Sequence, residues 1–295
     1  MIKHSGKGAK IFDIVNTIIL LILMLSCLYP LWYTFCLSIS SKEAVDAGMI
    51  TFFPIGVSLR SYKLIIRDVA FFHSIYVSVV RVVIGTVLNV GCMVLMAYPL
   101  SKTKQEYRPR NIMMWLLVFV MLFNGGTIPW YITVKSYGLI DSIWALVFSG
   151  SLSVFNIFLI ISFFQQIPKE LEEAAIMDGA GPWTILFKVV IPCSIPVLAT
   201  VVLFVAVGHW NEYLQGLLFI NSPENYPLQT YIKQITVKIS SDVSYTTEQL
   251  MELTSNSNKA VDAAKVFVSI IPMMIVYPFI QKYFVTGITL GAVKG

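Results

Sequence analysis

Residues 168–192 read Pro168-Lys-Glu-Leu-Glu-Glu-Ala-Ala-Ile-Met-Asp-Gly179, followed by Ala-Gly-Pro182-Trp-Thr-Ile-Leu-Phe-Lys-Val-Val-Ile-Pro192. The pattern predicts two short helices joined by a turn. Pro168 suits the first helical position, because its missing N–H loses no hydrogen bond there, and carboxylates in the first turns offset the helix dipole. Gly179 can take the left-handed conformation that ends the first helix. Pro182 can begin the second helix, and Pro192 limits its regular continuation.

Long apolar stretches flank this segment and recur along the chain. The 295 residues are 57% hydrophobic and 13% charged, whereas a soluble domain carries about 25% charged residues. Lipid cannot satisfy backbone polar groups and no alternating barrel pattern is present, so helices are expected. The sequence therefore predicts an all-α, polytopic membrane protein with a single domain over residues 1–295. Its six transmembrane helices, each near the roughly 20 residues needed to cross a bilayer, are placed at residues 14–39, 75–100, 112–132, 143–164, 189–207 and 266–284.

Basic residues orient these spans. Short cytoplasmic loops are enriched in Lys and Arg, and the loop after the second span holds four of them: Lys102, Lys104, Arg108 and Arg110. With six spans, both termini are then expected in the cytoplasm, together with residues 168–192 between spans four and five. The net charge of +5 is interpreted as a topology signal and not as a nucleic-acid surface. The first span is too long for a cleaved signal peptide and is expected to stay as an anchor in the cell membrane.

The first short helix of residues 168–192 has a face of mostly small side chains. Spacing of i, i+3, i+4 and i+7 brings four residues onto it: Leu171, Ala174, Ala175 and Asp178. Small alanines allow another surface to approach closely, which favours a docking element. An ordinary amphipathic loop on the membrane surface would show the same spacing, and capping signals are common, so the spacing alone leaves both interpretations open.

The same segment resembles the EAA loop of ABC importer permeases. Glu173-Ala-Ala is followed by three residues and Gly179, and then by nine residues and Val189-Val-Ile-Pro192. The usual ending in that family is Ile-x-Leu-Pro, and serine is more frequent at the position of Gly181, so the departures are small. The resemblance implies that this segment couples the permease to an ATPase through five residues: Glu173, Ala174, Ala175, Asp178 and Gly179.

The likeness covers most of the chain. Carbohydrate-uptake permeases contain blocks similar to residues 123–129, 137–141, 210–213, 226–229 and 282–295, and the first and last of these resemble the second permease of oligosaccharide importers. The resemblance implies a heterodimer with a related permease, two ATPase subunits and an extracellular solute-binding lipoprotein. No Gly-x-x-x-x-Gly-Lys-Ser/Thr phosphate loop occurs in the sequence, so ATP–Mg is expected on the partner ATPase. This chain is expected to be a transport subunit that is no enzyme and carries no cofactor.

Arg81 is the sharpest intramembrane feature, because it lies inside the second predicted span, where an ionisable side chain suggests a function by default. The alternatives are that it snorkels to the headgroups or pairs structurally with the partner permease. Asn89 and Asn156 are expected to form hydrogen bonds between helices. Three histidines, His209 among them, lack a partner pattern and are expected at a surface or interface. The four cysteines have neither metal-ligand nor disulfide spacing and are expected to be packing residues.

The outer end of the fifth span offers further candidates for the sugar path. At Trp210, Asn211 and Glu212, an indole can stack on a sugar ring while an amide and a carboxylate bind hydroxyl groups. An interfacial tryptophan with solvated neighbours is the alternative, and it is equally common. The third span is interrupted at Asn124-Gly-Gly, and Asn124 and Trp130 flank this break, from which they can face a cavity.

Two other classes of membrane protein fit the sequence less well. A secondary transporter is expected to show repeated halves and intramembrane acids for ion coupling, and Asp and Glu are absent from the span centres here. A membrane enzyme is disfavoured because neither His-Glu-x-x-His nor Gly-x-Ser-x-Gly occurs. Within the ABC class, import of another solute through the same docking loop stays open.

The first prediction tests the topology. In a chain whose four native cysteines are replaced by serine, a cysteine at Gln105 should react with a membrane-impermeant maleimide only from the cytoplasmic side, because the basic loop 102–110 stays inside. A cysteine at Ser255 should react only from outside. Labelling of inside-out and right-side-out vesicles measures both, and the reverse pattern would turn residues 168–192 away from any cytoplasmic ATPase.

Overall fold

The computed structural model describes residues 7–123, 125–150, 152–239 and 259–292, and every regular element in these ranges is a helix. The predicted all-α class is therefore confirmed for the described chain. The candidate Asn124 and the predicted outer labelling position Ser255 lie outside these ranges. Two compact units are present: the first comprises Met1–Phe71 and Gln234–Ile271, and the second comprises Phe72–Lys233 and Pro272–Gly295.

The first unit is built around the end of a long apolar helix. It contains α1 (Lys7–Ser38), α2 (Lys42–Asp46), α3 (Arg60–Ile66) and the start of α16 (Lys259–Ala292). Trp32 Nε1 donates to the carbonyl oxygen of Phe52 at 2.7 Å, and Lys265 pairs with Asp68 at 2.6 Å. The most apolar window of α1 is wholly exposed within the described structure, which is the surface expected for a helix surrounded by lipid.

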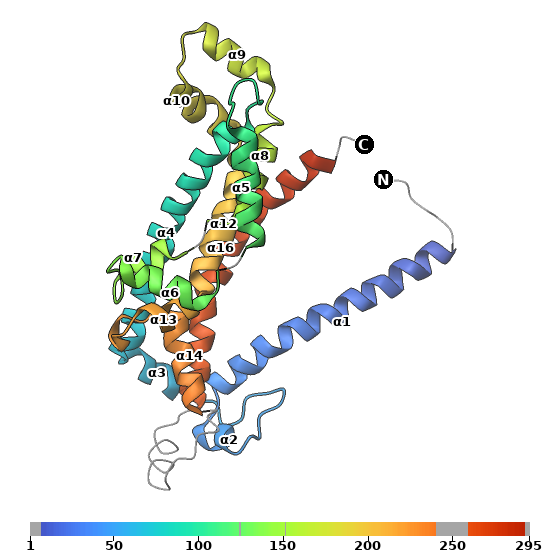
Figure 1. Cartoon of the computed structure of the whole chain (residues 1–295). Coiled ribbons are helices and arrows are strands. Elements are labelled where there is room, and N and C mark those ends of the chain that lie inside the picture. The colour runs from blue at the N-terminus through green and yellow to red at the C-terminus, as the bar shows by residue number, and fades with distance from the viewer. Residues whose placement is uncertain (1–6, 124, 151, 240–258, 293–295) are drawn as a thin grey trace. The chain divides into compact units, whose positions relative to one another are not determined.

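The second unit holds the end of α16, the helices from α5 to η2, and α4 and α14 except for residues 69–71 and 234–239, which fall in the first unit. Its core is the packing of α4, α5, α8 and α12. The elements are α4 (Val69–Ser101), α5 (Arg110–Leu122), α6 (Thr127–Ser136), α7 (Ile143–Phe148), α8 (Val154–Phe164), α9 (Lys169–Met177), α10 (Pro182–Ile185), η1 (Leu186–Val190), α11 (Ile191–Cys193), α12 (Ile195–Asn211), α13 (Leu214–Phe219), η2 (Pro223–Asn225) and α14 (Leu228–Ile239). Buried side chains from all four core helices meet, among them Ala97, Leu117, Ile160 and Val201. Within this unit α9 and α10 lie at one end of the core helices, and α6, α7 and α13 lie toward the other (Figure 1).

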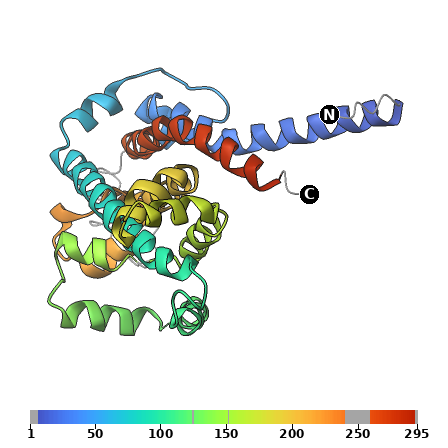
Figure 2. The same ribbon diagram turned by 90° about the horizontal axis from the view of Figure 1, so that it is seen from above.

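The predicted spans are not all continuous helices. By length and apolar composition, two described helices can cross a bilayer, Gly8–Ser38 and Val69–Ser101, or four if each of two bent helix pairs forms one span. The predicted break in the third span is present: α5 and α6 differ in direction by 116°, and Figure 2 shows α5 nearly end-on with α6 lying across it. The second bent pair is Pro182–Cys193 with α12, at 84°.

The prediction of one helix over residues 143–164 is wrong. The chain forms α7 and α8 instead, and α8 has 11 residues, so it is about 16 Å long at 1.5 Å per residue. A bilayer core is about 30 Å thick. The sequence between the helices is rich in serine, and Ser153 caps α8 by accepting a hydrogen bond from the Asn156 N–H at 3.3 Å. Gly150 and the Ser153 cap therefore end one helix and begin another, although the apolar composition of the whole stretch had predicted a single span.

Asp141 fixes the loop after α6. Its φ of 62° is a left-handed conformation, which Asp tolerates better than most residues. The Asp141 N–H donates to the Phe219 carbonyl oxygen at 2.7 Å, and its carboxylate accepts from Ser222 Oγ at 2.7 Å and from the N–H groups of Asn221 and Ser222. The Ser222 hydroxyl and N–H lower the pKa of Asp141, because they stabilise its charged form. This loop and the end of α13 are thus held together by one carboxylate.

Candidate functional site

The coupling segment, residues 168–192, folds as its sequence predicts. Helix α9 begins at Lys169, one residue later than expected, with Pro168 at the N-cap position. Gly179 has a φ of 80°, and two backbone hydrogen bonds close the end of α9. The Gly179 N–H donates to the Ile176 carbonyl oxygen and the Ala180 N–H donates to the Ala175 carbonyl oxygen, both at 2.9 Å. These two bonds define the Schellman ending, in which glycine supplies the left-handed residue. The predicted role of Gly179 as the helix terminator is confirmed.

The two sides of α9 face different surroundings. Ala175 packs against the core of the second unit, and Glu172 on the same side is half-buried. Leu171, Ala174 and Asp178 are exposed. The predicted common face is therefore divided, because Ala175 turns inward to its own helix bundle while the other three residues point away from it.

Large apolar side chains on the coupling segment are exposed in this chain. Met177 is 87% exposed and Trp183 is 66% exposed, and the Trp183 ring stacks on Phe187 with centroids 6.2 Å apart. The acidic Glu170 and Glu173 are also exposed, so the segment presents both apolar and negatively charged side chains. Exposed apolar groups rimmed by polar ones are typical of a protein interface.

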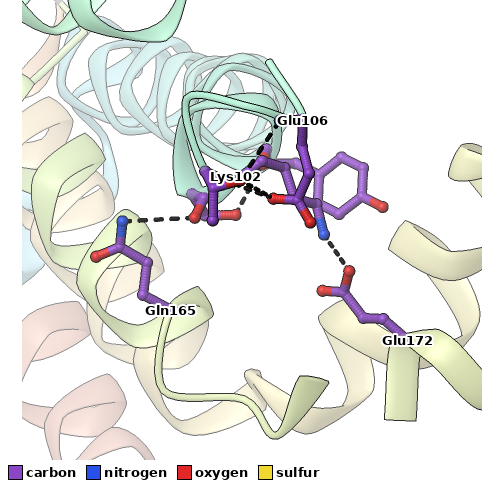
Figure 3. A network of polar contacts seen from close by, with 7 residues as sticks. Lys102, Glu106, Gln165 and Glu172 are labelled. Carbon is purple, nitrogen blue, oxygen red and sulfur yellow. Dashed lines mark hydrogen bonds and ion pairs between the residues drawn. The ribbon is translucent and has the colours of Figure 1, made fainter. Parts of the chain in front are cut away.

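The loop 102–110 contacts the coupling segment at this end of the second unit. Lys102 forms an ion pair with Glu172 of α9, as Figure 3 shows. Glu106 accepts hydrogen bonds from the Thr103 N–H at 2.7 Å and from Thr103 Oγ1 at 2.8 Å. These bonds lower the pKa of Glu106 by stabilising its carboxylate. The basic loop and the coupling segment are thus on the same side of the unit.

The coupling segment leads into α12 through an irregular helix. The residues after α10 form a π-helical turn, η1, and Pro192 follows within α11. A π turn shifts the hydrogen-bond register, which accommodates the N–H that proline lacks. The helix then turns by 84° into α12 next to Ser194, whose φ of −105° and ψ of 10° are not helical. Pro192 therefore permits a helical turn, and the break comes two residues later.

A second candidate site is a polar cavity inside the second unit, with a volume of about 390 Å³. Helices α4, α8 and α12 and the α12–α13 junction line it with Arg81, Asn89, Met93, Gly150, Ser153, Asn156, Phe204, Val205, Gly208, His209, Glu212 and Gln215. A cavity of this size with amide, hydroxyl and charged groups beside one aromatic ring can bind a polar solute through its hydroxyls.

Arg81 is held within this cavity wall. Its side chain is 1% exposed, and Nη1 donates to the Glu212 carbonyl oxygen at 3.2 Å while Nη2 donates to Gln215 Oε1. The Glu212 carboxylate does not bind Arg81. Its Oε1 accepts a hydrogen bond from the Leu214 N–H at 2.7 Å, at the start of α13. The guanidinium thus lies inside the unit, which does not fit the alternative of snorkelling to the headgroups.

His209 is buried within the second unit beside Arg81, and its predicted position at a surface or an interface is wrong. It is 6% exposed, and its Nε2 lies 3.0 Å from Asn89 Nδ2. The predicted interhelical role of Asn89 is therefore confirmed. Two glycines leave room for the imidazole: a Cβ on Gly85 would lie 2.6 Å from Nε2, and one on Gly150 would lie 3.0 Å from Cε1.

The other predicted sugar-path residues are dispersed. Glu212 lines the cavity, whereas Asn211 is exposed and Trp210 is 6% exposed and absent from the cavity lining. Trp130 packs edge-on against Phe219 with centroids 4.9 Å apart. The structure thus brings Arg81 and Glu212 together and leaves the others apart.

Sequence reasoning missed His209 and Gln215 as cavity residues. The sequence did contain a signal for a polar site between helices. Gly85 on α4 and Gly150 before α8 are small residues, and small residues let helices approach closely enough for polar side chains to form hydrogen bonds across them. Their pairing with His209 depends on the relative rotation of α4 and α12, which no spacing within one helix specifies.

Comparisons with known proteins agree on one family. The model of the binding-protein-dependent transport system inner membrane component matches residues 72–290. Protein LplC of Bacillus subtilis is 36% identical over 99% of this chain and 98% of its own length. The polygalacturonan/rhamnogalacturonan transport system permease protein YtcP of the same organism is 37% identical over 97% and 99%.

Solved structures give the same result. A chain in the crystal structure of a bacterial ABC transporter involved in the import of the acidic polysaccharide alginate is similar at a TM-score of 0.84 and 36% identity, covering 95% of this chain and 98% of that one. A chain of an alginate ABC transporter in complex with a pentasaccharide-bound periplasmic protein has a TM-score of 0.57 at 12% identity, which shows a shared fold alone.

The packing around His209 gives the second prediction. Gly85→Ala should lower the unfolding temperature of the purified protein, because the new methyl group overlaps the imidazole and overpacking costs about 1–3 kcal/mol. Gly91→Ala is the matched control on the same helix, since a Cβ there meets nothing within 4 Å. Thermal unfolding in detergent measures both, and equal unfolding temperatures would contradict the tight packing.

Proposed function

The chain belongs to the family of inner membrane components of binding-protein-dependent transport systems, and we propose that it is the permease subunit through which an ABC importer moves a carbohydrate into the cell. The family match covers residues 72–290, and the chain is a membrane protein of the transport class. Several relatives are named for the transport of oligosaccharides or polysaccharides, among them polygalacturonan/rhamnogalacturonan and maltodextrin, and the similar solved structure is named for the import of alginate. An oligosaccharide is therefore the proposed substrate.

One observation carries the proposal at the level of this chain. The coupling segment forms two short helices at one end of the second unit. Gly179 ends the first helix, and Pro182 begins the second. The outer surface of the segment is apolar and acidic and is uncovered in this chain. Such a surface suits a basic partner, and we propose that the partner is an ATPase subunit. Glu173, Ala174 and Asp178 would contact it, while Ala175 supports α9 from behind and Gly179 fixes its end.

The orientation of the chain follows from the same contacts. Loop 102–110 pairs with α9 through Lys102 and Glu172, so the basic loop supports a cytoplasmic position for the coupling segment as well. We further propose six spans, some of them bent, with both termini in the cytoplasm, and one permease domain over residues 1–295. The proposed assembly adds a related permease, two ATPase subunits that bind ATP–Mg, and an extracellular solute-binding lipoprotein.

The polar cavity is the proposed contact with the sugar. Arg81, Asn89 and Gln215 offer N–H donors, and Glu212 adds a carboxylate. Phe204, which lines the cavity and is 40% exposed, offers an apolar surface on which a sugar ring can pack. Trp210 is buried and supports the α12 end instead of stacking on the sugar.

The third prediction tests the cavity. Arg81→Gln should lower carbohydrate uptake at least about tenfold, as expected from the loss of charged hydrogen bonds worth about 1.5–3 kcal/mol, while the complex still assembles and hydrolyses ATP. Arg67→Gln removes an exposed guanidinium and should leave uptake unchanged. Uptake in proteoliposomes of the oligosaccharide bound by the lipoprotein measures the effect, and normal uptake by an assembled Arg81→Gln complex would remove Arg81 from the path.

The fourth prediction tests the coupling segment. Gly179→Val should insert normally but lose transport and co-purify less ATPase, because a β-branched residue in the left-handed region costs about 1–2 kcal/mol. Gly181→Val is the matched control: Gly181 lies two residues away with a φ of −78°, and neither glycine has a neighbour within 4 Å of an added Cβ.

A charge reversal complements this test without altering the backbone. Glu173→Lys changes an exposed side chain of α9 and should also weaken ATPase recovery. Wild-type ATPase recovery and wild-type uptake in both Gly179→Val and Glu173→Lys would show that this segment is not the docking element.

A further inference from the structure

We propose that Lys102 ties α9 to the end of α4, so that a displacement of α9 is carried along α4 to the polar cavity. This inference rests on the proposed function, because it assumes that an ATPase moves the coupling segment. Lys102 would act as a positioning residue, since it lies far from the cavity and can affect the cavity wall only through a movement of α4.

The last turn of α4 is a point where three elements are attached. Arg110 Nε, at the start of α5, donates to the Leu100 carbonyl oxygen at 3.0 Å. Gln165 Nε2, at the end of α8, donates to the Ser101 carbonyl oxygen at 3.4 Å, a contact drawn in Figure 3. The final carbonyl groups of a helix lack partners inside it, so these bonds anchor α4 to its neighbours in the bundle.

Lys102 adds the attachment to α9. Its Nζ lies 4.5 Å from the centre of the Tyr98 ring, one turn earlier on α4, and pairs with Glu172 across the gap between the elements (Figure 3). The aromatic face and the carboxylate hold the ammonium group from two sides. Of the two ion pairs found in the described ranges, this pair joins the coupling segment to a long helix.

Packing alone attaches α9 weakly to α4. No residue of α9 is buried, and a cavity of about 730 Å³ lies between the end of α4, loop 103–107, α9 and α10. Tyr98, Ile176 and Trp183 are among its lining residues. The ion pair therefore spans a space that side chains do not fill, and its loss would leave α9 resting mainly on Ala175.

Helix α4 links this attachment to the polar cavity. It is helical from Val69 to Ser101, with Pro99 in its last turn, and Arg81, Gly85 and Asn89 of the same helix form the cavity wall or contact His209. Lys102 and Arg81 are separated by about 30 Å at 1.5 Å per residue. A continuous helix is a rigid element that can carry a displacement over such a distance.

The experiment uses the assembled complex with a single cysteine in the cavity wall. In a chain whose native cysteines are replaced, Phe204→Cys reports the state of the cavity through its rate of reaction with a small thiol reagent. ATP–Mg with vanadate is the probe, so no sugar is needed. We expect the reaction rate to change on adding the probe, and we expect Lys102→Glu or Glu172→Lys to reduce that change at least fivefold.

The charge exchange separates coupling from folding. The double variant Lys102→Glu with Glu172→Lys should restore the change in rate, because the pair is re-formed with reversed charges. Lys104→Glu, an exposed position in the same loop, is the control and should behave as the reference chain. Co-purified ATPase is measured in each case, and it should be retained because the exposed side chains of α9 that are proposed to contact the ATPase are unchanged.

Three outcomes would overturn the inference. Single variants that keep the full probe response would show that the pair does not transmit the displacement. A double variant as impaired as the single ones, or single variants that fail to assemble, would show that these residues serve the fold. A reference complex that binds ATPase and ATP yet shows no probe response would contradict the proposed function as well, which distinguishes the two failures.

Discussion

A chain that crosses lipid must satisfy every backbone group that a helix break sets free, and this constraint organises the second unit. At the α12–α13 junction the Glu212 carbonyl oxygen accepts from Arg81, and the Glu212 carboxylate accepts from the first N–H groups of α13. At the α7–α8 break Gln215 Nε2 lies 3.5 Å from the Ser149 carbonyl oxygen. The polar cavity is therefore lined by the same side chains that satisfy the backbone groups set free at these two breaks.

This dual use explains why the cavity residues come from distant parts of the sequence. A break placed in one helix needs donors from another, and α4 supplies Arg81 to α12 across 131 positions of the chain. The same helix supplies Asn89 to His209. Helix α4 is thus both a span and the source of the groups that hold the breaks in place, so a shift of α4 must alter the cavity wall.

The sequence predicted the local features better than the contacts. Gly179 and Pro182 marked the ends of α9 and α10 correctly, because a left-handed glycine and an N-terminal proline act within a few residues. The break between α7 and α8 was missed, because the prediction gave more weight to the apolar composition of residues 143–164 than to Ser153 as a helix cap. The inward turn of Ala175 and the burial of His209 were also missed. Both depend on which element lies opposite, and the spacing of residues within one helix does not specify its neighbour.

The contacts of α4 at the cavity and its link to α9 differ in how firmly they hold, and the difference suits a transporter. Removing one partner from a buried polar contact such as Arg81–Gln215 leaves an unsatisfied group, at a cost of about 1–3 kcal/mol. A solvent-accessible ion pair is worth about 0.2–1 kcal/mol, and solvent reaches the Lys102–Glu172 pair, whose side chains are 20% and 24% exposed. The cavity end therefore resists distortion, while the coupling end can change its contacts at low cost. A movement that begins at α9 is then expected to shift α4 as a whole instead of unravelling the cavity wall.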